Sequence, residues 1–364
     1  MKLSQIFSGV PVTLGEEAGN REIAGITCDS RRAGPGWAFV CIRGTGADGH
    51  RYAAQAEKAG AAVIIAEEAV GCPGCTGTAA LVLVPSTRSV WAQMCANWFG
   101  RPGDRLHLIG ITGTNGKTST TYMLKTVLEA CGQKVGLIGT IQNMIGERVL
   151  PSAHTTPDPY DLQSMLALMA AEGCTYAVME VSSHALDQER VGGCTFDAAV
   201  FTNLTQDHLD YHGTMENYLA AKKKLFSLCR YAVVNADDPW AEKLTEGLTC
   251  PVVTYSAHLD QATYTAKNIR PRPDGVDFEL VGTAQIGRIR LEMKTLCVQA
   301  GIEATKVFPH NLRHLFARCY YQVCHDIVKL ADILGHSHIE TTRIYLLSTG
   351  TEHQYHLERL RLVS

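Results

Sequence analysis

The residues best suited to phosphate chemistry stand together in one short segment. Between an apolar run and an amphipathic stretch lies Gly113-Thr114-Asn115-Gly116-Lys117-Thr118-Ser119. In such a loop, backbone N–H groups and a helix N-terminus face the phosphate, the lysine pairs with its oxygens, and a Thr hydroxyl can bind Mg²⁺. Gly113 stands three residues before Gly116, whereas a Walker A loop has a spacing of about five. The segment therefore predicts a phosphate-binding loop of non-standard length.

Acidic and imidazole side chains follow two other apolar runs. Glu180 begins the segment that ends at His184, and His208 lies within Asn203–His212. In open parallel sheets, ligands bind at the carboxyl ends of the strands. The two segments therefore favour a Mg²⁺ site beside the loop, although helix capping or an ordinary polar turn would also account for Glu180 and His208.

A second group of chemically suited residues lies far downstream. His310 and Arg313 have the spacing His-x-x-Arg, and Tyr345 comes nine residues after His336. An arginine can bind a phosphate bidentately, histidines can move protons, and a tyrosine can form a phosphotyrosyl link. Alternatively, Tyr345 packs a helix and Arg313 is a surface charge.

Alternating strand and helix patterns surround the phosphate-binding segment. Near-continuous apolar runs that alternate with helical stretches are typical of a parallel sheet covered on both faces, which is an α/β fold. We expect strands at 106–111, 134–138, 176–181, 198–203 and 231–235, and helices at 117–130, 160–171 and 215–228.

The chain divides into three regions by pattern. Residues 1–100 form a small α/β domain, with a helical stretch at 52–59 and a helix near 89–98, and residues 105–293 form the domain that holds the phosphate loop. Residues 263–291 alternate as antiparallel strands do. After Met293 the pattern changes to short helices at about 309–321, 325–334 and 338–346, so residues 295–364 are expected to be all-α.

Composition limits the class of protein. The chain has 364 residues, a net charge of −3 and thirteen irregularly spaced cysteines. The cysteine spacing and the absence of a basic N-terminal segment with an apolar run argue against a disulfide framework and secretion. Because no run of about 18 apolar residues occurs, we expect no membrane segment and a cytoplasmic location.

Residues 1–293 resemble the Mur ligase family, in particular the members that add the third amino acid to the peptidoglycan precursor. The resemblance rests on many motifs in the same order along the chain. They are Thr27–Arg31, Asp48–His50, Thr112–Ser119, His154–Pro157, Glu180–Leu186, Gln188, Arg190, Asn203–His212, Ala221-Lys222 and Asn235–Asp238. The resemblance implies a precursor-binding first domain and an ATP-binding central domain.

The resemblance also implies ligands for individual residues. For ATP they are Gly113, Thr114, Asn115, Gly116, Lys117, Thr118 and Ser119, with Asn235 near the adenine. For the substrate they are Ser30 at the uridine nucleotide and Thr155, Thr156, Ser182, Gln188 and Arg190 at the muramoyl-dipeptide. For Mg²⁺ they are Thr118, Glu180, His208 and Lys222, the last as a carbamate that helps to bind a second ion.

The reaction implied is carboxylate activation. ATP would phosphorylate the terminal carboxylate of UDP-MurNAc-L-Ala-D-Glu, and the amine of diaminopimelate or lysine would attack the acyl phosphate. Lys117, His208 and carbamylated Lys222 would be the catalytic residues. Family members continue beyond the position of Met293 into a third domain that nothing here matches, so we expect precursor binding to survive better than ligation.

Residues 295–364 resemble the C-terminal end of a tyrosine recombinase catalytic domain of the phage-integrase type. His310, Arg313, His336 and Tyr345 match its motifs, with Tyr345 as the nucleophile. That family also needs an upstream arginine and a lysine on a β-hairpin, for which residues 294–307 leave no room. Three hypotheses are therefore open: a peptidoglycan-precursor ligase, a DNA-integration protein that contacts DNA through this tail, and an inactive fusion that only binds nucleotide.

Overall fold

The computed structural model describes residues 1–44, 46–69, 74–272, 275–282 and 285–292. The chain splits into two compact units, Met1–Thr265 and Ala266–Ser364. The recombinase-like residues His310, Arg313, His336 and Tyr345, with the helices expected around them, lie outside the described residues. The motifs that resemble those of Mur ligases all lie within the described residues.

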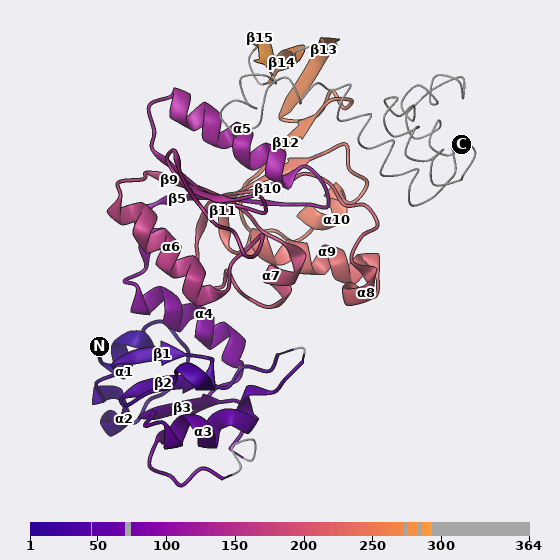
Figure 1. Ribbon diagram of the computed structural model, residues 1–364. Coiled ribbons are helices and arrows are strands. Elements are labelled where there is room, and N and C mark those ends of the chain that lie inside the picture. Colours follow the sequence, from indigo (N-terminus) through magenta and orange to yellow (C-terminus); the bar gives the residue numbers. More distant parts are fainter. Residues whose placement is uncertain (45, 70–73, 273–274, 283–284, 293–364) are drawn as a thin grey trace, which may run out of the picture. The chain divides into compact units, whose positions relative to one another are not determined.

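The N-terminal part of the first unit is a small parallel sheet with helices on both faces, which agrees with the small α/β domain expected there (Figure 1). Its strands lie in the order β1-β2-β3-β4. They are β1 (Gly25–Thr27), β2 (Trp37–Val40), β3 (Val63–Ala66) and β4 (Ala80–Leu83). The helices are α1 (Leu3–Ile6), α2 (Glu16–Asn20), α3 (Ala53–Lys58) and α4 (Thr87–Trp98), with 3-10 turns at Ser30–Arg32 and Gly49–Tyr52.

A larger sheet forms the rest of the first unit. Its neighbouring strands follow the order β12-β11-β10-β5-β9-β6-β7-β8, and they are parallel from β12 to β6. The parallel strands are β5 (His107–Thr112), β6 (Val135–Ile138), β9 (Tyr176–Glu180), β10 (Phe196–Phe201), β11 (Cys229–Asn235) and β12 (Val252–Ser256). Because every expected strand is present, the phosphate loop and the acidic segments meet at one sheet edge.

Helices cover both faces of this sheet (Figure 1). On one face Leu124 and Leu128 of α5 pack on Ile111 and Val178, and on the other the core includes residues of α6, α7 and α9. The helices are α5 (Lys117–Ala130), α6 (Pro159–Ala171), α7 (Ser183–Asp187), α8 (Leu209–His212), α9 (Met215–Lys223) and α10 (Ala241–Thr245), with a 3-10 turn at Pro102–Arg105.

Two expectations about the elements of this domain are corrected. The helix expected at 215–228 ends at Lys223, and a 3-10 turn at Lys224–Ser227 follows it, burying Leu225 and Phe226. The edge of the sheet also carries two antiparallel strands that the sequence pattern did not indicate, β7 (Asn143–Ile145) and β8 (Arg148–Leu150). At three residues each they are too short to show a period.

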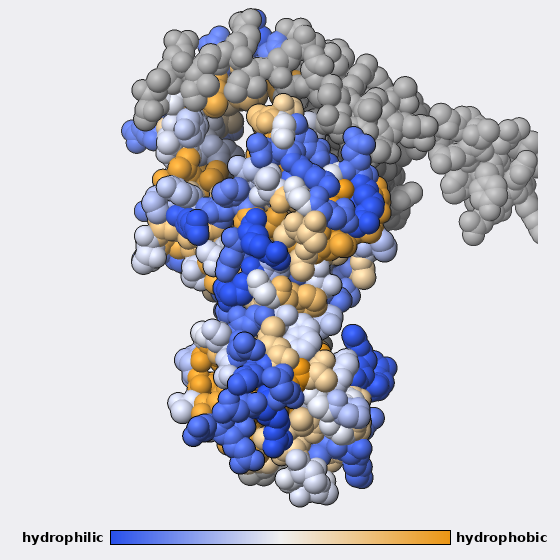
Figure 2. All heavy atoms as spheres, turned by 90° about the vertical axis from the view of Figure 1, so that its left-hand side faces the viewer, coloured by the Kyte–Doolittle hydropathy of each residue, from blue (hydrophilic) through white to orange (hydrophobic). Residues whose placement is uncertain are grey.

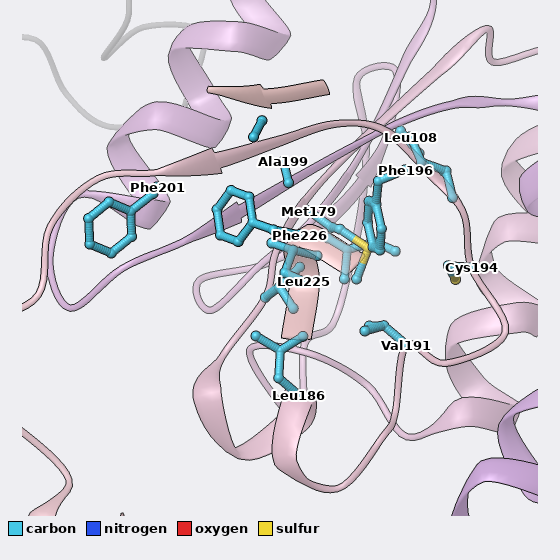
Figure 3. Packing of buried hydrophobic residues seen from close by; sticks show 14 of the residues in the cluster. Leu108, Met179, Leu186, Val191, Cys194, Phe196, Ala199, Phe201, Leu225 and Phe226 are labelled. Atoms are coloured by element: carbon cyan, nitrogen blue, oxygen red, sulfur yellow. The ribbon is translucent and has the colours of Figure 1, made fainter. Parts of the chain in front are cut away.

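The main core lies between the larger sheet and the helices α6, α7 and α9. Figure 3 shows side chains from β5, β9 and β10 meeting Leu225 and Phe226 of the 3-10 turn. Phe196, Phe201 and Leu225 are fully buried, at 0% exposure. The packing fixes the strand ends that carry the polar site residues.

The second unit contains an antiparallel hairpin within residues 263–291, where antiparallel strands were expected, but the start of that range pairs in parallel with β12. β14 (Gly275–Val281) pairs with β15 (Gln285–Glu292) in antiparallel register. β13 (Tyr264–Arg272) begins in the first unit, where Tyr264 pairs with Tyr255 of β12. Of the helices that the structure describes, none is long and apolar enough to cross a membrane. On the face in Figure 2 apolar side chains form patches among hydrophilic ones.

Candidate functional site

The phosphate-binding loop connects β5 to α5 through two glycines in the left-handed region. Gly113 has a φ of 148° and Gly116 a φ of 85°. A Cβ on Gly113 would lie 1.9 Å from Thr202 Oγ1, so no other residue fits there without a shift. The loop therefore lies close against the end of β10, and the N-terminus of α5 begins at Lys117, as the sequence indicates.

Two lysines converge on one carbonyl of this loop. Lys117 Nζ donates to the carbonyl oxygens of Gly113 and Thr114, each at 2.8 Å, and Lys222 Nζ donates to Gly113 O at 2.8 Å. Lys222 is 1% exposed, and its Nζ lies 4.4 Å from the ring centroid of Tyr218. Burial, and then the charge of Lys117, lower the pKa of Lys222 well below its usual value. Burial also lowers the pKa of Lys117.

Glu180 is the last residue of β9 and is 1% exposed. Its Oε2 accepts from Thr118 Oγ1 at 2.8 Å and from Thr140 Oγ1 at 3.2 Å, and its Oε1 accepts from Thr140 N at 2.9 Å. A carboxylate and a hydroxyl at a helix N-terminus are the oxygen ligands that a phosphate-bound Mg²⁺ uses. Thr118 and Glu180 therefore fit the magnesium role expected of them.

His208 differs from that pair in its surroundings. It is nearly half exposed in its side chain, adopts a φ of 51°, and faces Asp207 with Nε2 at 3.4 Å from Oδ2. Its ring is 4.9 Å from the ring of His184, centroid to centroid. Over the described part of the chain, no three His, Cys, Asp or Glu side chains form a group that could hold a metal ion. Bound phosphate oxygens and water would have to complete a magnesium shell.

Four of the five residues expected at the muramoyl-dipeptide, Thr156, Ser182, Gln188 and Arg190, are joined by hydrogen bonds. Arg190 donates through Nη1 to Thr156 O and through Nη2 to Gln188 Oε1, each at 2.9 Å, and pairs with Asp158 at 3.1 Å. Thr156 Oγ1 donates to the Glu180 carbonyl at 2.8 Å and accepts from Ser182 N at 3.0 Å. This set is therefore tied directly to the strand that carries the magnesium candidate.

A cavity of about 230 Å³ opens beside Arg190 and Gln188. It is lined by the segments that follow β1 and β2, by α4, by the start of α6 and by the segment after α7. The lining residues are Cys28, Ile42, Gly44, Arg88, Trp91, Asp158, Pro159, Gln188 and Arg190. Ser30, expected at the uridine, is not among them, and its Oγ donates to Gln55 Oε1 at 3.2 Å. Thr155 accepts from Thr140 Oγ1 at 3.0 Å and also lies outside this lining.

Asn235 ends β11 at the same sheet edge. Its Nδ2 donates to Thr202 O at 2.9 Å, and its Oδ1 accepts from Asp237 N at 3.1 Å. One hydrogen bond of this amide therefore holds the residue directly after β10, and the other holds the turn that follows β11. A contact with adenine stays a prediction.

Three residues that the structure brings to the site were not predicted from the sequence. Thr140 follows β6 and binds Glu180 through both its backbone and its side chain. Arg88 and Asp158 line the cavity. Thr140 could have been found, because it follows an expected strand at the same edge, whereas nothing about Arg88 in sequence marks it as a cavity residue.

Comparison with known families gives three matches. The profile of the Mur ligase middle domain matches residues 111–298, and that of the Mur ligase family catalytic domain matches residues 22–90. The profile of the phage integrase family matches residues 286–352. These matches confirm both resemblances inferred from the motifs.

Several similar curated proteins carry the same name. A UDP-N-acetylmuramoyl-L-alanyl-D-glutamate--2,6-diaminopimelate ligase from Caldanaerobacter subterraneus subsp. tengcongensis is 45% identical over 282 residues, covering 77% of this chain and 57% of that protein. The ligase of the same name from Alkaliphilus metalliredigens is 46% identical over 285 residues, covering 77% and 56%. The chain thus spans less than two thirds of the length of these relatives.

Solved structures agree on the fold. A UDP-N-acetylmuramoyl-L-alanyl-D-glutamate--2,6-diaminopimelate ligase superposes with a TM-score of 0.67 at 27% identity, over 84% of this chain and 65% of that one. MurF from Acinetobacter baumannii superposes with a TM-score of 0.50 at 20% identity, over 85% and 66%, and shows the fold alone.

Proposed function

We propose that this chain, which belongs to the Mur ligase family, acts in peptidoglycan-precursor synthesis as an ATP-dependent ligase. The observation that carries the proposal is the arrangement at the end of β5. Lys117 and Lys222 meet at the carbonyl of Gly113, while Thr118 and Glu180 are hydrogen-bonded at the start of α5. Such a site suits an activated phosphoryl group rather than a protein nucleophile.

In the proposed reaction these residues bind and align. The first N–H groups of α5 and the Lys117 ammonium would face the ATP phosphates, and leaving the carbonyls of Gly113 and Thr114 would free Lys117 to do so. Thr118 and Glu180 would hold Mg²⁺, which neutralises charge on the transferring phosphoryl group when bound. His208, exposed at the same edge, would assist as a further magnesium ligand.

Lys222 would act as its carbamate. Carbamylation requires a neutral amine, which adds to CO₂ and releases a proton, and burial already favours the neutral form of Lys222. The resulting anion would lie beside the Lys117 ammonium, because both lysines contact Gly113 O. The carbamate would help to bind a second Mg²⁺.

The proposed substrates are UDP-MurNAc-L-Ala-D-Glu and diaminopimelate. The names of the similar curated proteins favour diaminopimelate over lysine. The cavity beside Arg190 would take part of the precursor, with Gln188 and Arg190 of its lining at the dipeptide. Thr155, Thr156 and Ser182 would contact the dipeptide, and Ser30 the uridine, from outside that lining. Because ATP is the co-substrate, we place this reaction in the cytoplasm.

The test is ADP release that requires both substrates. The full chain is incubated with ATP, Mg²⁺, UDP-MurNAc-L-Ala-D-Glu and diaminopimelate, and ADP and the tripeptide product are measured. Turnover is expected to fall by about 10³-fold or more in Lys117→Ala, since charge neutralisation in phosphoryl transfer is worth several powers of ten. Absence of any product at saturating substrate would refute the ligase proposal. If the chain forms no product but still binds ADP, the result supports the hypothesis of an inactive fusion that only binds nucleotide.

A second candidate function, DNA strand exchange, is favoured by one observation, the phage integrase match over residues 286–352. Tyr345 would attack a DNA phosphate and release a 5′ hydroxyl, with Arg313, His310 and His336 around the phosphate. This function is tested by incubating the chain with a nicked DNA duplex, which traps the covalent protein–DNA adduct, and measuring that adduct. An adduct that disappears in Tyr345→Phe supports this function, and no adduct with the wild-type chain counts against it.

A further inference from the structure

The residues directly after β10 hold the phosphate-binding loop in place. We call Thr202–Thr205 the β10 loop. Asn203 O accepts from Thr114 N at 2.8 Å. Both backbone groups of Thr205 bind the hydroxyl of Thr114. The Thr205 N–H donates to Thr114 Oγ1 at 3.0 Å, and the Thr205 carbonyl accepts from Thr114 Oγ1 at 3.2 Å. The position of Thr114 is thus set by a different strand end from its own.

The side chain of Asn203 fixes the next residue of the loop. Its Oδ1 accepts from Asn115 N at 3.0 Å, and its Nδ2 donates to Asn115 O at 3.1 Å. Thr202 Oγ1 donates to the same carbonyl at 2.6 Å. A side-chain amide offers a donor and an acceptor together, so it can satisfy both backbone groups of one residue. The backbone of Asn115 is therefore fully engaged by the β10 loop.

The β10 loop is itself held from its other side. Asn235 Nδ2 donates to Thr202 O at 2.9 Å, and Asp238 Oδ2 accepts from Leu204 N at 2.8 Å. Asp238 is 8% exposed, and its Oδ1 accepts from Trp240 N at 2.9 Å. The ends of β11, β10 and β5 are thereby joined in one hydrogen-bonded chain.

This arrangement decides which N–H groups face a phosphate. Those of Thr114 and Asn115 are used by Asn203. The first N–H groups of α5, beginning at Lys117, have no partner within the helix and stay free for an anion. Their direction depends on the peptide of Asn115, which Asn203 fixes.

We propose that Asn203 is a positioning residue for nucleotide binding, which acts by holding the Asn115 peptide so that the N-terminus of α5 faces the nucleotide phosphates. The proposal rests on the proposed function, since it needs a nucleotide at this loop. Asn203 itself touches no phosphate. The affinity that depends on it is that of ATP and ADP, not that of the UDP-linked precursor.

The experiment measures binding of Mg²⁺·ADP and of UDP-MurNAc-L-Ala-D-Glu to the full chain by calorimetry, for wild type and Asn203→Ala. The matched control is Asn97→Ala. Asn97 is buried on α4 and donates two hydrogen bonds of 2.8 Å to Ile6 O and Ser8 O, so its loss disturbs the fold without touching the loop. We expect the Kd for ADP to rise about tenfold or more in Asn203→Ala, as two lost hydrogen bonds allow, and to stay within about twofold in the control.

A second variant guards against a folding defect in Asn203→Ala. Thr202→Val keeps the shape of the side chain and removes the donor to Asn115 O, together with a longer contact of the same hydroxyl to Thr112 O at 3.3 Å. A rise in Kd of about threefold is expected. Because both side chains donate to the same carbonyl, each can still satisfy it when the other is lost, so the double variant should lose more affinity than the product of the single effects. Hydrogen exchange at the loop should quicken in both.

The outcomes separate this proposal from the proposed function. If the wild-type chain does not bind ADP, the proposed function fails and this inference falls with it. If wild type binds ADP and Asn203→Ala binds it equally well, the inference alone is overturned. Equal loss of ADP and precursor affinity would also overturn it, because a general folding defect lowers both.

Discussion

Lys222 is buried beside Tyr218, and among the residues that the structure describes no carboxylate lies within hydrogen-bonding distance of its Nζ, which donates to the Gly113 carbonyl. Burial without an ion pair penalises the ammonium form, which is why its pKa is lowered. Replacing it with an apolar side chain of similar length removes that penalty. A residue retained at such a cost is typical of a functional site.

We therefore predict that Lys222→Met raises the free energy of unfolding by about 1 kcal/mol at pH 7, while ligase turnover is lost. Urea denaturation measures the first effect. The matched control is Lys125→Met: Lys125 is also buried, but its Nζ pairs with Glu129 at 2.5 Å, so its loss should not stabilise. Equal destabilisation by both substitutions would contradict the prediction.

The sequence was enough to predict which residues belong to the phosphate-binding loop, but not which distant residues contact it. Lys117 and Thr118 are marked by their place after Gly116, and Glu180 by its place after an apolar run. Nothing in the sequence says that Lys222 reaches Gly113, since 109 residues separate them. Thr140 and Asn203 gained their roles only from the order β10-β5-β9-β6, which brings distant strand ends together.

The loop between β5 and α5 depends on Gly113 for its shape. Its φ of 148° and the 1.9 Å approach of a Cβ to Thr202 Oγ1 leave no space for a side chain. We predict that Gly113→Ala raises the Kd for ADP about tenfold or more, because the loop must move away from the β10 loop. Calorimetry with ADP measures it.

Gly132 provides the control at the opposite end of α5. Its φ is 81°, and a Cβ there meets no atom within 4 Å. Gly132→Ala should therefore cost stability through backbone strain but leave ADP affinity within about twofold. If both variants lower the affinity alike, strain rather than the contact with Thr202 is responsible.

Helix α3 is tied to residues 76–79 by a buried carboxylate. Glu57 Oε2 accepts from Thr76 N at 2.6 Å, and Oε1 accepts from Ala79 N at 3.0 Å. The N–H of Ala79, then that of Thr76, lower the pKa of Glu57 from 4.5 to about 2. Since the folded pKa lies below the unfolded one, this stabilisation is complete above pH 4.5 and is lost as the pH falls toward about 2.

We predict that Glu57→Gln lowers the free energy of unfolding by about 1–3 kcal/mol at pH 7, because one acceptor becomes a donor facing an N–H. The difference from wild type should shrink as the pH falls from 4.5 toward about 2, because Glu57 takes up its proton in the unfolded chain before it does so in the folded one. Denaturation curves across that range measure it. Glu147→Gln, in the exposed turn between β7 and β8, should change stability by less than about 0.5 kcal/mol at any pH.

The sequence predicted the bounds of long helices with a clear hydrophobic period, but not the short elements. Helix α5 has the expected bounds, Lys117–Ala130, because a glycine loop precedes it and an amphipathic stretch fills it. Helix α9 is shorter than expected because Leu225 and Phe226 turn into the core through a 3-10 turn. Burial of two adjacent apolar residues outweighed helical propensity there.

Within the first unit, the two proposed ligands would bind at different parts of the fold. The loop between β5 and α5 belongs to the domain of the larger sheet alone, whereas the cavity beside Arg190 is lined by the segments after β1 and β2, by α4 and by the segments that begin α6 and follow α7. Gly193 lies where the larger sheet's connections meet α4. A Cβ on it would lie 2.5 Å from Ala92 O and 2.8 Å from Ala96 Cβ.

We predict that Gly193→Ala raises the Kd for UDP-MurNAc-L-Ala-D-Glu about tenfold and leaves that for ADP within about twofold, because displacing α4 moves the cavity wall but not the phosphate loop. Calorimetry with each ligand measures the two Kd values. Gly15→Ala is the control: like Gly193 it has no positive φ, and a Cβ there meets nothing within 4 Å. Unchanged precursor affinity in Gly193→Ala would show that this cavity is not the precursor site. A parallel loss of ADP affinity would show that the cavity and the phosphate-binding loop are not independent of each other.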